Sequence, residues 1–107
     1  MDKDNRVYLK QILEAIGKVQ KYLTRVSLND FLQNEMVQDA TIRKLEVIGE
    51  AVNRLPDNKL FSIAVKMRNK LIHDYDEIKL EVVWQTVKKD LPIMEKQIKE
   101  FLKNLGK

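Results

Sequence analysis

One short segment of the chain contains the side chains best suited to chemistry: Arg68, Asn69, His73, Asp74 and Tyr75. His73 is the single histidine of the sequence. Histidine exchanges protons near neutral pH because the pKa of free imidazole is about 6.5. Arginine stays charged and can bond two anionic oxygens at once. A simpler interpretation also stands, because a lone helical histidine usually packs or caps and a helical arginine usually pairs with a surface carboxylate.

The residue types that are missing narrow the chemistry further. The 107 residues include no cysteine and one histidine. A disulfide, a thiolate nucleophile and a cysteine-containing zinc site are therefore excluded, and one chain cannot supply a metal centre with several histidines. We expect neither a metal nor a cofactor.

Length and composition predict one soluble domain. A chain of 107 residues makes a single domain with one modest core, placed here at residues 1–107. With 44% apolar and 34% charged residues, the sequence resembles neither a disordered chain nor a membrane protein. The charged N-terminus leads into no signal-peptide core. We therefore expect a cytoplasmic protein that does not enter a membrane.

The net charge of +4 is concentrated at the two ends of the chain. Residues 1–26 carry six basic and three acidic side chains, and residues 79–107 carry seven and four. Residues 58–78, which include the candidate segment, carry four and three. The terminal lysines alternate with glutamates at helical spacing, which is typical of a solvated helix face. The charge permits binding to a polyanion but does not by itself predict it.

The elements that position the candidate residues must be helices. Three glycines and two prolines are too few for a turn-rich β fold. Apolar residues at steps of three and four predict main helices over about residues 6–24, 35–54, 58–75 and 79–105.

Local signals add a short helix and a kink. Ser27 followed by Asp30 predicts the N-cap of a short helical turn through Phe31. Pro92 lies inside the last predicted helix and predicts a kink near residues 88–91. Four main helices, one short extra helix and short connections together predict an all-α antiparallel bundle.

The candidate segment resembles a known family. Arg68, four intervening residues, His73, one residue and Tyr75 reproduce the Arg-x4-His-x-Tyr motif of HEPN-domain proteins. In particular, the chain resembles the HepT-like toxins over nearly its whole length, including the block of residues 38–51 and the sequence Asp-Leu-Pro at residues 90–92. An isolated arginine–histidine pair would be a weak signal, whereas the motif combined with these blocks is specific.

The resemblance implies an activity, a partner and a role for each residue of the motif. It implies a homodimeric HEPN-like bundle that acts as a metal-independent endoribonuclease toxin beside a minimal nucleotidyltransferase antitoxin. Cleavage by the 2′-hydroxyl of the RNA needs a proton carrier and a cation at the phosphate, which suits His73 and Arg68. Asn69 would position the phosphate and Asp74 would support the site. Tyr75 would accept adenosine monophosphate from the antitoxin, although by itself it also fits a core position.

Helix geometry places a constraint on the catalytic pair. Five residues apart on a helix, Arg68 and His73 lie about 140° apart around the axis and about 7.5 Å apart along it. One chain would therefore struggle to direct both side chains at one phosphate. Two chains related by a two-fold axis could interleave their motifs and supply a second imidazole. We therefore expect the dimer to be required for activity.

Polar residues of the helix predicted over residues 35–54 have two interpretations. Arg43, Glu46 and Glu50 repeat at steps of three and four and fit a solvent-exposed ladder of ion pairs. Alternatively, Glu50 could orient Arg68, and Arg43 could contact RNA or the second chain. Trp84 fits a packing anchor of the last helix better than a platform on which bases stack.

A second function also agrees with the family resemblance. Some HEPN relatives have been viewed as non-catalytic nucleotide- or substrate-binding subunits of a two-component nucleotidyltransferase. Such a protein would bind nucleotide or its partner and leave RNA intact. A bundle that serves only protein interaction would have no need of the intact motif.

Overall fold

The chain folds into a bundle of helices. A computed structural model describes residues 3–55 and 79–105, which contain helices and no strand. The elements in chain order are α1 (Lys3–Tyr22), α2 (Leu28–Gln33), α3 (Glu35–Asn53), α5 (Leu80–Gln85), the π-helical turn η2 (Thr86–Asp90) and α6 (Leu91–Leu105).

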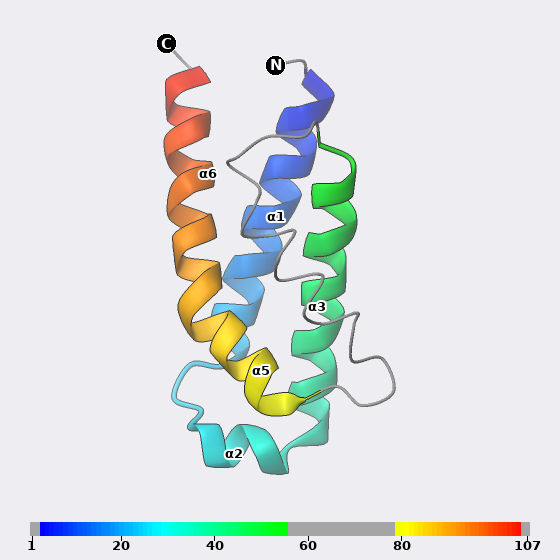
Figure 1. Cartoon of the computed structure of the whole chain (residues 1–107), viewed down its shortest axis with the longest axis vertical. Coiled ribbons are helices and arrows are strands. Elements are labelled where there is room, and N and C mark those ends of the chain that lie inside the picture. Colours follow the sequence, from blue (N-terminus) through cyan, green and yellow to red (C-terminus); the bar gives the residue numbers. More distant parts are fainter. Residues whose placement is uncertain (1–2, 56–78, 106–107) are drawn as a thin grey trace.

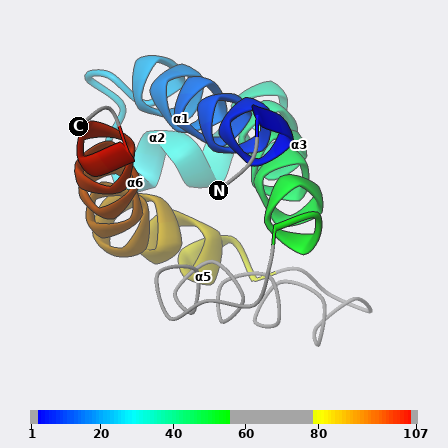
Figure 2. The same cartoon turned by 90° about the horizontal axis from the view of Figure 1, so that it is seen from above.

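Helix α1 is the centre of the described bundle. It lies between α3 and α6 and runs antiparallel to both, as Figures 1 and 2 show. Its contacts with α3 are the most extensive of the described elements, and α6 covers its other flank. The short helix α2 lies across one end of the bundle and contacts α3 and α5. The all-α antiparallel prediction is confirmed for these elements.

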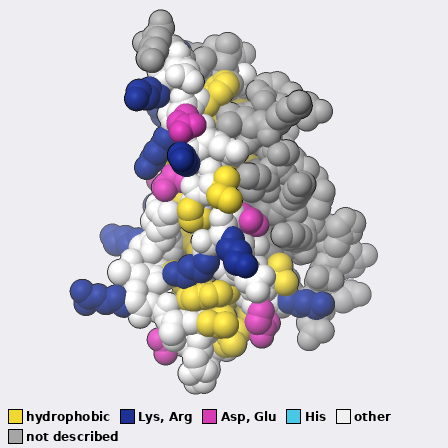
Figure 3. All heavy atoms as spheres, turned by 60° about the vertical axis from the view of Figure 1, so that its left-hand side comes forward, with side chains coloured by type: hydrophobic (Ala, Val, Ile, Leu, Met, Phe, Trp, Pro, Cys, Tyr) yellow, Lys and Arg dark blue, Asp and Glu magenta, His cyan; other side chains and the backbone are white. Residues whose placement is uncertain are grey.

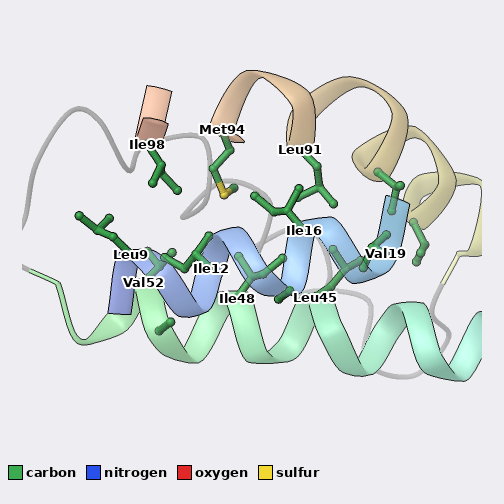
Figure 4. Packing of buried hydrophobic residues seen from close by; sticks show 14 of the residues in the cluster. Leu9, Ile12, Ile16, Val19, Leu45, Ile48, Val52, Leu91, Met94 and Ile98 are labelled. Atoms are coloured by element: carbon green, nitrogen blue, oxygen red, sulfur yellow. The ribbon is translucent and has the colours of Figure 1, made fainter. Parts of the chain in front are cut away.

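The core forms where α1 faces its two neighbours. Side chains of α1 lie between those of α6 and those of α3 in Figure 4. The apolar spacing of residues 6–24 predicts one buried face formed by Tyr8, Ile12, Ile16, Val19 and Leu23. The last four are buried, Tyr8 is only partly buried, and Leu9, outside this series, is fully buried. Because α1 is covered on two flanks, it buries a wider arc than a helix that rests on a single neighbour.

The capping signal before α2 is confirmed. The Ser27 hydroxyl oxygen accepts a hydrogen bond from the Asp30 amide at 3.1 Å, and the Asp30 carboxylate accepts one from the Ser27 amide at 3.3 Å. This reciprocal pair is a capping box in which aspartate replaces the usual glutamate or glutamine. It fixes the start of a helix that would otherwise be too short to persist, and it directs Phe31 into the core.

The last predicted helix is divided where Pro92 disturbs its hydrogen bonds. Proline has no amide hydrogen to donate, so the regular ladder cannot continue through it. One extra residue is accommodated in η2, where the Leu91 amide donates to the Thr86 carbonyl five residues earlier. The Thr86 hydroxyl also donates to the Val82 carbonyl at 2.8 Å. The chain changes direction here between α5 and α6 (Figure 1), close to the predicted kink.

The predicted helix over residues 58–75 lies outside the described residues. This helix, and with it the predicted number of four main helices, remains a prediction.

Candidate functional site

The residues of the Arg-x4-His-x-Tyr motif lie outside the described residues, as do their neighbours: Arg68, Asn69, His73, Asp74 and Tyr75. Their predicted roles therefore remain predictions. The described structure does show the two elements that flank this segment in the chain, the end of α3 and the start of α5.

The end of α3 is attached to α1. The Arg54 guanidinium lies 5.6 Å from the centre of the Tyr8 ring, at cation–π distance. The next residue, Leu55, belongs to the buried core. These two contacts fix the point from which the chain enters the motif segment.

The start of α5 is fixed by packing at its first turns. The Lys79 carbonyl accepts hydrogen bonds from the amides of Val82 and Val83, and Val83 is fully buried. The chain that follows the motif segment therefore begins with α5, a helix that is packed into the core of the bundle.

The predicted ion-pair ladder of α3 is present. Arg43 Nη1 lies 3.4 Å from Glu46 Oε2 and 4.0 Å from Glu50 Oε1. All three side chains are more than half exposed, so the pairs add only a few tenths of a kcal/mol each. The structure thus brings together Arg43 and Glu50, two of the predicted site residues. Of the two carboxylates, that of Glu46 lies nearer to Arg43. Glu46 follows Arg43 by three residues, a spacing at which side chains are neighbours on a helix.

The ion pairs of the ladder determine how an anion could reach Arg43. Two carboxylates flank its guanidinium, so a phosphate would have to displace at least one of them. Because exposed pairs are weak, this exchange costs little. The ladder interpretation is confirmed, and the proposed contact of Arg43 with RNA is compatible with it.

Trp84 packs as predicted. Its ring lies against the core, with its centre 5.5 Å from that of the buried Phe31 ring at an angle of 43°. The Lys88 ammonium lies 4.8 Å from the centre of the Trp84 ring. The indole is therefore an anchor between α5 and α2, with a lysine over it, and not a free stacking platform.

No described helix combines the length and the apolar character needed to cross a membrane.

Comparison with known proteins identifies the family. A family model described as "Ribonuclease HepT-like" matches residues 12–63 and 58–101, which together include every residue of the candidate motif. No solved structure matches the chain.

Curated relatives extend the match over almost the entire chain. A "probable ribonuclease HepT" of Thermococcus cleftensis is 34% identical over 110 residues, which is 96% of this chain and 100% of the relative. A "putative RNase" of Caldanaerobacter subterraneus subsp. tengcongensis is 36% identical over 107 residues, covering 94% of this chain and 96% of the relative. A Methanocaldococcus jannaschii protein named "gamma-glutamylcyclotransferase and putative RNase" is 34% identical over 114 residues, and this chain spans only 51% of its length.

An all-α bundle with an Arg-x4-His-x-Tyr segment before its last helices defines the HEPN class. Within this class, the chain belongs to the HepT-like ribonuclease family.

Proposed function

We propose that this protein is a metal-independent endoribonuclease, the toxin of a pair whose antitoxin is a minimal nucleotidyltransferase. The observation that carries the proposal is the intact Arg68-x4-His73-x-Tyr75 motif in a chain of the HepT-like ribonuclease family. Relatives over nearly the same length carry ribonuclease names, which supports the same activity here. The protein would act in the cytoplasm on RNA.

The proposed reaction is an internal transesterification of RNA. A base removes the proton of a 2′-hydroxyl, the 2′-oxygen attacks the adjacent phosphorus, and the 5′-oxygen of the next nucleotide leaves with a proton from an acid. The products are a 2′,3′-cyclic phosphate and a 5′-hydroxyl, so the step consumes no water. His73 transfers protons, and Arg68 stabilises the extra negative charge on the phosphorane.

The site is proposed to form between two copies of the chain. On a single helix, Arg68 and His73 diverge by about 140°, whereas two antiparallel copies could bring arginines and histidines from both motifs to one phosphate. Asn69 would hold the phosphate and Asp74 would support the motif. A stable monomer with full ribonuclease activity would contradict this part of the proposal.

Two residues of α3 are proposed to assist the motif. Arg43 would hold RNA or the second chain, and Glu50 would orient Arg68. The support is that Arg43 and Glu50 lie together on an exposed face of α3, where their weak ion pair can be exchanged for other partners.

RNA cleavage by the purified chain in excess EDTA tests the activity. We expect cutting at an undiminished rate, with 5′-hydroxyl and cyclic phosphate ends, because the reaction needs only protein side chains. Loss of cutting in EDTA that Mg²⁺ restores, or products with 5′-phosphate ends, would contradict the proposed chemistry. An RNA that stays intact while nucleotide binds would favour the non-catalytic binding subunit.

We also propose that the antitoxin silences this protein by adenylylation of Tyr75. A phosphate attached to the phenol beside the cleft would pair with Arg68 and occupy the space that RNA needs. After coexpression with its proposed nucleotidyltransferase antitoxin, intact-mass measurement should show a gain in mass that corresponds to AMP. The gain should be absent from Tyr75→Phe, which removes only the acceptor oxygen.

The outcome of the mass measurement also separates two modes of silencing. Silencing with an unchanged mass would indicate tight binding by the antitoxin in place of modification. A mass gain that persists in Tyr75→Phe would place the modification on another residue.

A further inference from the structure

A basic depression lies between the end of α1 and the start of α6, away from the ion-pair ladder of α3. Gln20, Leu23, Thr24 and Arg25 line it from the α1 side, and Val87, Lys88 and Pro92 line it from η2 and α6. Its volume is about 280 Å³. We call it the α1–α6 pocket.

The α1–α6 pocket combines an apolar floor with a positive rim. Leu23 and Val87 are almost fully buried, whereas Arg25 and Lys88 are exposed. On the face shown in Figure 3, Lys and Arg side chains lie directly beside hydrophobic ones. An open apolar floor between two cations suits a ligand with both a negative group and an uncharged, flat part.

The two cations of the rim have no acidic partner in the described part of the chain. Two basic residues of the adjacent helices α1 and α6 do form such pairs: Lys18 with Glu14 at 3.3 Å, and Lys99 with Glu95 at 3.8 Å. Arg25 forms no such pair with a described carboxylate, and the one recorded contact of the Lys88 ammonium is with the Trp84 ring. Trp84 is therefore a positioning residue that holds Lys88 at the rim.

Glu95, an acidic residue of α6 that contacts the pocket residue Gln20, is directed to other partners. Glu95 accepts a hydrogen bond from Gln20 Nε2 at 3.5 Å through Oε1, and its Oε2 faces Lys99. Its two oxygens therefore contact Gln20 of α1 and Lys99 of α6, and neither has a recorded contact with Arg25 or Lys88. The rim keeps its two positive charges for a ligand.

The backbone at Arg25 gives independent support. Its φ of 62° lies in the left-handed region, where the Cβ of any residue other than glycine crowds the backbone. Glycine is the usual residue at such a helix end. An arginine at this position therefore costs stability, so backbone conformation does not explain why it is there.

We propose that the α1–α6 pocket binds a phosphate of single-stranded RNA outside the bond that is cut. Arg25 and Lys88 would hold the phosphate oxygens, and the floor of Leu23, Val87 and Pro92 would receive the adjacent base or sugar. The inference rests on the proposed ribonuclease function and extends it to how the substrate is held. Contacts of this kind add affinity and register without base specificity.

Arg25→Gly tests the pocket without disturbing the fold, because glycine suits the left-handed backbone. We expect binding of a 2′-O-methyl oligoribonucleotide, which cannot be cut, to weaken about three- to ten-fold. The slope of log affinity against log salt should fall by about 0.7, the value for one phosphate contact on a single strand. The thermal unfolding midpoint should stay at or above that of the parent. A loss of RNA affinity would then not be caused by a loss of stability.

Lys10→Ala is the matched control. It removes one exposed positive charge from α1 about 18 Å along the axis from Tyr22, the residue at which this helix ends shortly before Arg25. It should leave the salt slope unchanged. Lys88→Gln should act in the same direction as Arg25→Gly, and the double variant should lose less than the product of the two effects if both side chains hold one phosphate.

Each result separates the pocket from the proposed function. If the parent cuts RNA and Arg25→Gly binds it like Lys10→Ala, the pocket is not an RNA site, while the ribonuclease proposal stands. Weakened binding of the antitoxin with unchanged binding of RNA would likewise overturn it in favour of a protein interface. If the parent neither binds nor cuts RNA, the proposed function fails and takes this inference with it.

Discussion

His73→Ala should lower the rate of RNA cleavage by roughly 10²- to 10⁴-fold, the range that a positioned proton-transfer group contributes. The effect should be this large because the chain has one histidine, so no other imidazole of the same protomer can replace it. His73→Gln should be equally slow, since its side chain keeps similar size and hydrogen bonding but does not titrate. The measurement is the single-turnover cleavage rate of a labelled RNA with saturating protein.

A control variant separates catalysis from folding. Gly17→Ala changes an exposed position of α1 where an added Cβ would meet no atom within 4 Å. It should leave the cleavage rate unchanged and raise the free energy of unfolding by about 0.5–1 kcal/mol, because alanine is the better helix former. Cleavage by His73→Gln at the parental rate, with the protein folded, would remove histidine from the mechanism.

Mixing two inactive variants would locate the site between chains. Arg68→Ala and His73→Ala, each inactive as a homodimer, should regain part of the activity when mixed, because a heterodimer retains one intact arginine and one intact histidine. A mixture that stays inactive although heterodimers form would argue against a site shared in this way. Exchange of subunits can be followed with a mass-tagged copy of one variant.

Most of the described fold could be predicted from local signals. Apolar spacing located α1 and α3 within three residues at their starts and within two at their ends. The serine–aspartate pair at the start of α2 acts over three residues, so its capping box could be predicted from sequence alone. These features depend on residues that are close in the chain.

The remaining features depend on residues that are distant in the chain. Leu9 is buried because α6 covers one flank of α1, and α6 begins some eighty positions later. The proline signal indicated a kink but not that the turn would take a π-helical form, because that depends on how α5 and α6 pack. The pocket at Arg25 likewise forms only where the end of α1 meets η2.

The candidate site likewise combines features set by residues close in the chain with features that depend on distant residues or on a second chain. The motif of Arg68 and His73 is a spacing within one segment and could be recognised directly. Its proposed assembly depends on how two chains dock against each other. The spacing of Arg68 and His73 in the sequence constrains this docking only through the angle between the two side chains around the helix axis. For Arg43, spacing predicted the ladder, and the structure added that Glu46 is its nearer partner.

Phe31→Ala should destabilise the protein by about 3–5 kcal/mol, the cost of emptying an aromatic core position. The ring is fully buried and lies 5.5 Å from Trp84, so the substitution removes both apolar burial and an aromatic contact between α2 and α5. The loss would be a large part of the roughly 5–15 kcal/mol that holds a domain folded. Denaturant unfolding at one fixed protein concentration measures it and avoids the effect of any oligomer on the midpoint.

The comparison within α2 makes the test specific to the core contact. Leu28→Ala removes an apolar side chain from the same short helix, but Leu28 is 38% exposed, so its loss should cost about 1 kcal/mol or less. Phe31→Leu should fall between the two, because leucine restores most of the apolar volume without the ring. Equal losses for Phe31→Ala and Leu28→Ala would mean that α2 is peripheral to stability. The expected order instead makes Phe31 the residue through which a six-residue helix joins α3 to the last helices.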